Sequence, residues 1–471
     1  MSILFVAAVF WWFVIGIGEY TGGGRLLAAI AVAAIAPLLQ PQFVAVALVH
    51  RLTRSAPTFA LRAGAVALSY CAAEWIVPKL FGDTIGHGLY ASRHLRQAAD
   101  LAGAPGLTFV LLLVNVCLLE TGRRWTRSRN WRAATPAIFA SALVVTLFGY
   151  GVYRLRQLEA AAADAERITA AIIQANISHY AQLSEKMGSY AATRHILDAH
   201  FRLSEQALRE PGVDLLVWPE TVYPTTFGVP KSEVGAELDR EIIAFAGAAR
   251  IPLIFGAYDA DGAGEYNAAI FLQADGARSS KQAYRKGSLF PLTERTPWPL
   301  DTQLVRSWWP WLGTWQPGDA ARVMAFDRPS GKPLRIAPLI CYDAVDAGRV
   351  LDAVDNGAEL IVTLSNDSWF SAGGGPWLHL VVSAFRSLET RRAQVRATNT
   401  GVSALITPTG DIDVSAGVGE QAVVVADLPL SQESATLMLA WGDWFGSASA
   451  AAAAVFVAAC LSAFRRRPAP A

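Results

Sequence analysis

Hydrophobic residues are distributed unevenly along the chain, with long apolar runs gathered at its two ends. A helix needs about 20 apolar residues to cross a bilayer. Runs of about this length cover 3–17, 26–49, 59–80, 107–119, 135–152 and 447–464. Pro37 and Pro41 are expected to kink the second run, because proline removes a backbone donor. This pattern predicts a bundle of membrane helices, about five early in the chain and one near its end.

The middle of the chain has a different pattern, in which short apolar runs alternate with helical ones. The short runs predict strands at 172–177, 214–219, 252–258, 267–272, 335–341, 359–365, 402–407 and 422–427. The helical patterns cover 190–208, 233–249, 343–356 and 378–397. Strands alternating with helices predict an α/β sheet covered on its faces. The expected domains are therefore N-terminal transmembrane helices at 1–153, a globular domain at 154–446, and a last transmembrane helix with a basic tail at 447–471.

Composition and charge support a membrane protein and exclude one class of partner. The chain is 53% hydrophobic and only 17% charged, whereas soluble domains carry about 25% charged residues. Its 40 Lys and Arg balance 39 Asp and Glu, so no basic surface favours a nucleic acid. Basic residues cluster at 123–132 and 465–467. The positive-inside rule places both clusters in the cytoplasm, and the globular domain is then expected on the outer side.

Cys341 is the only cysteine of the globular domain. A lone cysteine is commonly a small buried hydrophobe. Cys341, however, ends an apolar strand and precedes a helical pattern. That position exposes a nucleophile at a strand end, and a helix N-terminus there lowers the thiol pKa. The position alone fits both a packing role and a catalytic one.

Two further charged residues are candidates for the chemistry. Glu220 comes directly after a buried strand, where desolvation raises a carboxyl pKa toward the range of a general base. It also fits a surface turn, because Pro219 interrupts the strand. Lys286 lies at another strand end, where a lysine is either solvated or able to stabilise a tetrahedral intermediate. Glu294 is eight residues further on and is expected either to pair with Lys286 or to lie at the rim.

The sequence motifs of other common catalytic and binding sites are absent. The seven His residues show no H-E-x-x-H pattern and no cluster with cysteine, so no metal site is expected. The chain has no phosphate-binding G-x-x-x-x-G-K-[ST] loop and no G-x-S-x-G nucleophile motif. These absences leave the cysteine and the two charged residues as the candidate chemistry.

Three motifs, taken in order, resemble the Glu-Lys-Cys triad of the nitrilase superfamily. They are Trp-Pro-Glu220, Tyr-Arg-Lys286 and Ile-Cys341-Tyr-Asp. More of the chain resembles one membrane branch of that superfamily, the apolipoprotein N-acyltransferases. The segments that carry this second resemblance are SNDSWF at 365–370, GPWLH at 375–379, RATNTGVS at 396–403, LRQAADLAG at 95–103 and EW at 74–75. The resemblance covers about residues 70 to 445.

The resemblance implies a nitrilase-like α-β-β-α sandwich inserted before the last transmembrane helix. It also implies roles for single residues: Glu220 as general base, Lys286 as oxyanion support and Cys341 as nucleophile. Glu294 and Tyr342 are implied to support them, with substrate contacts at Trp218, Asp343, Trp369 and His379. Neither a cofactor nor a metal is expected.

The implied reaction takes place at a bacterial inner membrane, with the catalytic domain on the periplasmic side. A phospholipid acyl chain passes to the Cys341 thiol and then to the α-amino group of a diacylglyceryl-cysteine lipoprotein, because a thioester is a good acyl donor to an amine. The alternatives are a membrane-tethered amidase that resolves the acyl-enzyme with water or another amine, and a binding module without catalysis. Five tryptophans at 298, 308, 309, 311 and 315 fit core packing or, somewhat better, a membrane-dipping lid.

Overall fold

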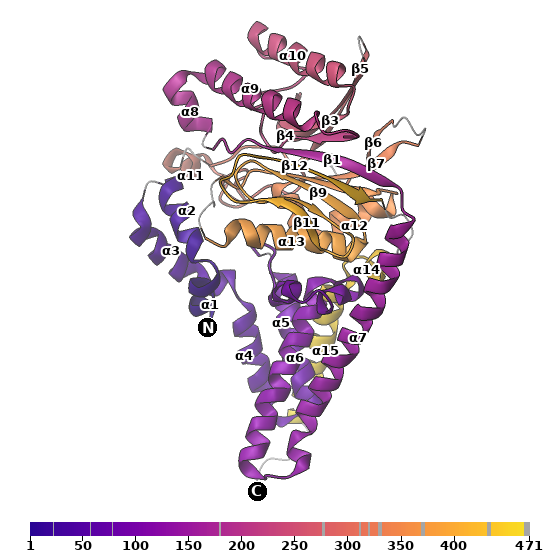
Figure 1. Ribbon diagram of the computed structural model, residues 1–471. Helices are drawn as coiled ribbons and strands as arrows, with labels where there is room; N and C mark the ends of the chain where they lie inside the picture. The colour runs from indigo at the N-terminus through magenta and orange to yellow at the C-terminus, as the bar shows by residue number, and fades with distance from the viewer. Residues whose placement is uncertain are drawn as a thin grey trace. The chain divides into compact units, whose positions relative to one another are not determined.

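The computed structural model describes residues 1–471 apart from 22, 57, 78, 179, 276–277, 310–311, 319–320, 328–331, 369–372, 431–434 and 466–471. The chain divides into two compact units, both drawn in Figure 1. The helical unit comprises residues 1–160 and 435–471, and the sheet unit comprises residues 161–434.

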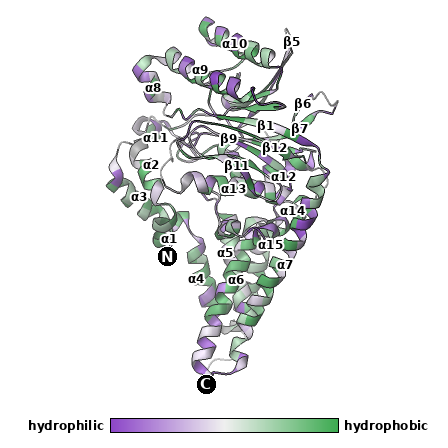
Figure 2. Ribbon diagram, in the orientation of Figure 1, coloured by the Kyte–Doolittle hydropathy of each residue, from purple (hydrophilic) through white to green (hydrophobic). Residues whose placement is uncertain are grey.

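The helical unit consists of α-helices joined by short loops and 3₁₀ turns. The α-helices are α1 (Ser2–Val9), α2 (Trp11–Thr21), α3 (Gly24–Leu39), α4 (Gln42–Leu52), α5 (Phe59–Ile76), α6 (Ala99–Arg127), α7 (Thr135–Ala163), α14 (Leu437–Trp441) and α15 (Trp444–Arg465). The 3₁₀ turns are η1 (Thr53–Ser55), η2 (Ile85–Ala91), η3 (Leu95–Ala98) and η4 (Trp131–Ala134). Hydrophobic residues predominate along α6 and α7 (Figure 2).

Fewer helices than expected are long and apolar enough to span a membrane. Within the described residues, Leu95–Arg127 and Trp131–Ala163 pass on length and composition. The pair α3 and α4 forms a third span if its 43° bend is counted as one broken helix. The bend lies where Pro41 precedes α4, as the proline pattern predicted. The first apolar run is instead divided into α1 and α2, and the last contributes the shorter apolar stretch Trp444–Ala459.

The sheet unit contains two six-stranded sheets. The strands are β1 (Arg167–Gln174), β2 (Leu215–Val217), β3 (Leu253–Asp261), β4 (Gly264–Asp275), β5 (Arg278–Arg285), β6 (Met324–Phe326), β7 (Leu334–Ile340), β8 (Leu360–Ser365), β9 (Ala393–Thr398), β10 (Ser403–Ile406), β11 (Ile412–Ala416) and β12 (Ala422–Pro429). One sheet has the order β12-β1-β2-β3-β4-β5, and the other has the order β11-β10-β9-β8-β7-β6. The strands β1 to β3 run parallel, as do β7 to β9.

Helices cover the outer face of each sheet, which gives the expected four layers (Figure 1). The helices of this unit are α8 (Tyr180–Met187), α9 (Ser189–Ala207), α10 (Glu233–Ala249), α11 (Gln303–Trp308), α12 (Ala347–Asp355) and α13 (Gly375–Thr390), with the 3₁₀ turn η5 (Cys341–Val345). Alternation along β1 explains the layering: Ile168 and Ile172 belong to the core between the sheets, while Ile173 packs in the core that includes α9 and α10. The α-β-β-α fold predicted for this region is therefore present.

One helix prediction is wrong over its last third. The pattern at 378–397 predicted a single helix, but α13 ends at Thr390 and β9 begins at Ala393. Arg391 ends the helix in the left-handed conformation, with φ of 56°. The helical pattern gave a wrong prediction here because β9 is a central strand. Its polar side chains, including Gln394 and Arg396, are fully buried, so polarity along the sequence does not mark an exposed helix face. The strands β5, β6 and β11 were also not predicted.

Candidate active site

The candidate residues gather at the carboxyl ends of parallel strands. Glu220 follows β2, Cys341 follows β7 directly, and Asn366 follows β8. In open α/β sheets this edge is where side chains from several strands converge on a ligand. The two sheets of the sandwich thus contribute to one site.

Glu220 is a buried carboxylate held on both oxygens. Its Oε1 accepts hydrogen bonds from Asn267 Nδ2 at 2.7 Å and Lys286 Nζ at 3.2 Å, and its Oε2 accepts one from the Asn366 backbone N–H at 2.8 Å. Burial raises the Glu220 pKa, and the attraction of Lys286 does not reverse the shift. A carboxylate with a raised pKa, oriented by three donors, is suited to accept a proton.

A close backbone approach fixes the position of Glu220. Gly256 on β3 lies directly against the turn after β2, and a Cβ at this position would come within 2.5 Å of the Glu220 Cα. Only glycine therefore allows the two segments to pack at this distance. The next residue, Thr221, has φ of 58°, so the chain turns sharply after the carboxylate.

Lys286 is almost fully buried and lies between two carboxylates. Its Nζ is 2.7 Å from Glu294 Oε1 and 3.2 Å from Glu220 Oε1. Burial alone would lower the Lys286 pKa, but the two carboxylates outweigh it and hold the pKa well above its ordinary value. Glu294 is fixed in turn by the Phe290 N–H, which donates to Oε2 at 2.7 Å. Of the two expectations for Glu294, pairing with Lys286 is the one observed.

Cys341 corrects one electrostatic prediction. The sequence predicted a lowered thiol pKa from a following helix, but burial and the nearby Glu220 carboxylate raise it, and Lys286 only partly compensates. The segment directly after Cys341 is the five-residue turn η5, and the α-helix α12 begins only at Ala347. The residue has φ of 49°, a strained conformation that sets the thiol at a sharp strand-to-turn bend. A raised thiol pKa favours the protonated form, and attack by that form needs a base to take its proton.

Asp343 joins the Lys286 segment to the Cys341 segment. Its Oδ2 accepts from the Ile340 N–H at 3.0 Å and from the Tyr284 hydroxyl at 2.9 Å. Its Oδ1 accepts from the backbone N–H groups of Gly287 and Ser288 at 3.2 and 2.7 Å. Because both oxygens are fully used and the side chain is buried, we propose that Asp343 positions the site, in place of the expected substrate contact.

A second buried network holds the backbone of the nucleophile. His379 on α13 has Nε2 3.3 Å from the Cys341 carbonyl oxygen and Nδ1 3.0 Å from Asp367 Oδ1. Arg396 on β9 donates to Asp367 Oδ2 at 3.1 Å. Burial and Arg396 lower the His379 pKa. Although burial opposes the shift, His379 and Arg396 bring the Asp367 pKa to about 2. The sheet that contains β7, β8 and β9, together with α13, therefore holds the Cys341 backbone in place.

The depressed pKa of Asp367 predicts a component of acid stability. Its folded value is about 2 and its ordinary value is 3.8, so ionised Asp367 stabilises the fold above about pH 4. This stabilisation, about 2 kcal/mol, is lost as the pH falls from about 4 to about 2. Thermal unfolding of the detergent-solubilised chain between pH 7 and 2 measures it. Asp367→Asn should be less stable at neutral pH and converge on the natural chain in acid; parallel curves would contradict the assignment.

Three other predicted site residues have different surroundings. Trp218 lies in the core on the outer side of its sheet, where its Nε1 donates to the Ser204 hydroxyl at 2.9 Å. Tyr342 is half-buried and packs edge-on against Phe290 at 5.1 Å. Trp369 lies outside the described residues. The geometry thus brings Glu220, Lys286, Glu294 and Cys341 together and removes Trp218 from the site.

Asn267 is the main residue of the site that was not predicted from the sequence. This side chain lies on β4, on the face shared with Ala269 and Phe271 of the core between the sheets. Its Nδ2 bridges Glu220 and Glu294, at 2.7 and 3.4 Å, while its buried Oδ1 has no partner among the described residues. The available signal was a lone amide in the apolar run YNAAIFL. Within the described residues, no group of three His, Cys, Asp or Glu is arranged to hold a metal ion.

Two family profiles match this chain, one over its N-terminal part and one over the sheet unit. The carbon-nitrogen hydrolase family profile matches residues 169–438. The profile of the apolipoprotein N-acyltransferase N-terminal domain matches residues 1–117. Together these matches cover most of the two units.

Individual relatives are similar at low identity. An apolipoprotein N-acyltransferase of Chlorobaculum tepidum is 27% identical, over 71% of this chain and 64% of its own length. One of Bdellovibrio bacteriovorus is 28% identical, over 80% of this chain and 69% of its own length. The chain thus spans less than two thirds of the Chlorobaculum protein. Among solved structures, Saccharomyces cerevisiae Nit3, a member of branch 10 of the nitrilase superfamily, is 19% identical, covering 56% of this chain and 90% of that chain with a TM-score of 0.40.

Proposed function

The chain belongs to the carbon-nitrogen hydrolase family, and from this premise we propose that it is an apolipoprotein N-acyltransferase. The proposed reaction moves a fatty acyl chain from a phospholipid to the N-terminal α-amino group of a diacylglyceryl-cysteine lipoprotein. The observation that carries it is the buried arrangement of Glu220 and Lys286, both within electrostatic reach of a cysteine at a strand end.

The first half-reaction forms a thioester on Cys341. Its sulfur attacks the ester carbonyl carbon of the phospholipid, and Glu220 accepts the thiol proton as the C–S bond forms. The Lys286 ammonium offsets the negative charge on the carbonyl oxygen of the tetrahedral intermediate. The ester C–O bond then breaks, and Glu220 returns the proton to the departing lysophospholipid oxygen.

The second half-reaction transfers the acyl group to nitrogen. The neutral α-amino group attacks the thioester carbonyl, the C–S bond breaks, and an amide forms. One amine proton passes through Glu220 to the departing sulfur, which restores the thiol. Lys286 again faces the developing oxyanion. At the end of the cycle Cys341 is again a thiol and Glu220 is again a carboxylate.

The helical unit favours a membrane transferase over a water-using amidase. Residues 1–117 match the N-terminal domain profile of apolipoprotein N-acyltransferases, and α6 and α7 are long and apolar enough to span a membrane. We therefore propose a multi-pass protein of a bacterial inner membrane, with the domain at 154–446 on the periplasmic side. Its last helix, at 447–464, would return the tail to the cytoplasm. Both substrates are lipids, so a tethered active site shares their location.

Intact-protein mass spectrometry tests the proposed reaction. Incubation of the purified chain with phosphatidylethanolamine should add one fatty acyl mass that hydroxylamine removes, as expected for a thioester. Addition of a synthetic diacylated lipopeptide should then move that mass to the peptide amine. Loss of the adduct as free fatty acid, at the same rate with and without lipopeptide, would favour the amidase. No adduct on the folded chain would favour the binding module.

The exposed tryptophans around α11 give a separate prediction. Trp298, Trp308 and Trp309 are 90%, 66% and 47% exposed, whereas Trp315 packs on Tyr258 at 4.6 Å; Trp311 lies outside the described residues. Exposed aromatic rings are enriched at membrane interfaces. In nanodiscs with brominated lipid, tryptophan quenching should fall in the double variant Trp308→Ser, Trp309→Ser by more than in Trp315→Phe. Equal losses would contradict membrane insertion of this segment.

A further inference from the structure

One buried carboxylate links the backbone of Lys286 to that of Cys341. Asp343 lies two residues after the thiol and accepts from the N–H groups of Gly287 and Ser288, which directly follow the lysine. The strands that lead to the lysine and to the thiol, β5 and β7, belong to different sheets. The distance between the ammonium and the sulfur therefore depends on how this carboxylate is held.

The Asp343 carboxylate is buried among neutral donors. Its four hydrogen bonds come from three backbone N–H groups and the Tyr284 hydroxyl. Burial raises the Asp343 pKa, and the Ser288 N–H, Arg349 and Lys286 act against that shift. The Arg349 Nε lies 3.7 Å from Asp343 Oδ1. Because a buried charge without a counter-charge is strongly destabilising, the guanidinium favours the ionised form that all four donors require.

Arg349 occupies a helix position that does not favour a cation. It is the third residue of α12, and the dipole at a helix N-terminus disfavours positive charge. Asp346 compensates in part: its Oδ1 accepts from the Arg349 backbone N–H at 3.4 Å, and its Oδ2 lies 3.8 Å from Arg349 Nε. Burial alone would lower the Arg349 pKa, but Tyr284, Asp343 and Asp346 outweigh it. A residue that departs from a local helix rule in this way is expected near a functional site.

The guanidinium also lies directly against the segment that carries the lysine. A Cβ added to Gly287 would come within 2.2 Å of Arg349 Nη1 and 2.3 Å of its Cζ. Such an approach is below any ordinary contact distance, so the absence of a side chain at Gly287 provides the room that the guanidinium occupies. Arg349 therefore touches both sides of the link, the Asp343 carboxylate and the backbone next to Lys286.

We propose that Arg349 is a positioning residue of the active site, which sets the place of the Lys286 ammonium through Asp343 and Gly287. It does not contact the reacting atoms, so its effect is on the geometry of the oxyanion support and not on proton transfer. The inference rests on the proposed role of Lys286 in the reaction. It adds to that reaction a residue that lies outside the cluster of Glu220, Lys286 and Cys341.

Stopped-flow measurement of a p-nitrophenolate burst tests the role of Arg349. The probe is p-nitrophenyl butyrate, a small ester that can acylate Cys341 without a lipid acceptor. In the detergent-solubilised full chain, Arg349→Ala should lower the acylation rate at saturating ester by about 10- to 100-fold, because a displacement of about 1 Å at a catalytic group costs up to this much. The half-saturating ester concentration should change less than about threefold, since the lost interaction is made in the transition state. Arg349→Lys, which keeps the charge, should recover part of the rate.

A methyl group at Gly287 gives a sharper test, because it would take the place of the guanidinium. Gly287→Ala should displace the flexible arginine and slow acylation about as much as Arg349→Ala does. Once Arg349→Ala has vacated that space, adding Gly287→Ala should cost little more. The control Gly262→Ala, whose methyl group would meet nothing within 4 Å, should react at the natural rate. An unchanged rate in Arg349→Ala, or equal losses from Gly287→Ala with and without Arg349, would overturn the proposal.

Lipopeptide acylation by the same variants separates this inference from the proposed function. A normal burst with the expected coupling of positions 287 and 349, but without transfer to a lipopeptide, would overturn the transferase and leave the role of Arg349 intact. Transfer without that coupling would do the reverse. If the folded natural chain gave no burst, the roles of Lys286 and Arg349 would be overturned together. If Arg349→Ala does not fold, Arg349→Lys takes its place in the comparison with Gly287→Ala, because lysine lacks the planar fork that meets the methyl group.

Discussion

Replacing Cys341 by alanine should abolish acyl transfer while leaving the chain folded. The side chain is the only sulfur nucleophile of the sheet unit, and without it no covalent acyl-enzyme can form. We expect the transfer rate to fall by at least about 10⁴-fold, the scale of losses when a catalytic nucleophile is removed. The hydroxylamine-labile acyl mass should also disappear. Both are measured on the same preparation, by lipopeptide acylation and by intact mass.

A matched variant separates chemistry from packing. Cys117 on α6 is also buried, so Cys117→Ala removes a sulfur of similar exposure far from Cys341 in the sequence. It should acylate normally and lose at most a little thermal stability. Cys341→Ala should share its melting behaviour, because removing one sulfur atom leaves only a small cavity. Undiminished transfer in Cys341→Ala would eliminate the thioester mechanism, and equal losses in both variants would indicate a folding defect.

Much of the layered fold could be predicted from local pattern. The run at 359–365 is mostly apolar, and β8 occupies Leu360–Ser365 with every residue buried. The helix predicted at 233–249 is α10, whose start is fixed by the Ser232 side chain accepting from the Gly235 N–H at 3.1 Å. The strand β9 could not be predicted in this way. Its buried polar residues find partners far apart in the sequence, such as Asp367 for Arg396.

The same distinction applies to the site. Glu220 and Cys341 were candidates because they lie at the ends of predicted strands, and such ends are visible in the sequence. Lys286 was also placed at a strand end, although β5, the strand before it, was not among the strands predicted. Asn267 lies within a strand. Its place in the site depends on a hydrogen bond to Glu220, which is 47 positions away in the sequence. The sign of the Cys341 pKa shift was wrong for a related reason. The sequence shows the segment that follows the thiol, but the burial and the opposing carboxylate depend on the fold. The catalytic roles of all three residues stay predictions.

Glu220→Gln should slow formation of the thioester by about two to four orders of magnitude. Glutamine keeps the size of the side chain and an oxygen for the Asn366 N–H, but it cannot accept the thiol proton. The raised pKa of the Cys341 thiol adds to this loss, because it disfavours the thiolate that could react without a base. The natural chain should also lose activity as the pH falls through the raised Glu220 pKa, since the base must be ionised. That inflection should be absent in the variant.

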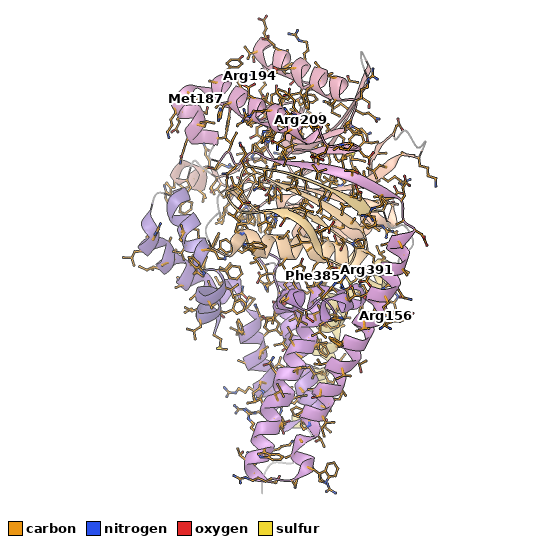
Figure 3. All side chains as sticks on the ribbon, viewed as in Figure 1. Arg156, Met187, Arg194, Arg209, Phe385 and Arg391 are labelled. Carbon is orange, nitrogen blue, oxygen red and sulfur yellow. The ribbon has the colours of Figure 1, made fainter. Side chains whose placement is uncertain are left out.

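Single-turnover acylation, followed by mass over a range of pH, measures both effects of Glu220→Gln. The control is Glu241→Gln on α10, a carboxylate that accepts from Arg194 Nη2 at 2.8 Å; Arg194 lies on α9, in the outer layer of the sheet unit (Figure 3). It removes one negative charge from that layer and should leave the rate and the pH profile unchanged. If Glu220→Gln kept the same acid inflection as the natural chain, another group would be the base. Because Lys286 stays beside Glu294 in either case, a reduced rate with an unaltered inflection would assign Glu220 to positioning the lysine instead.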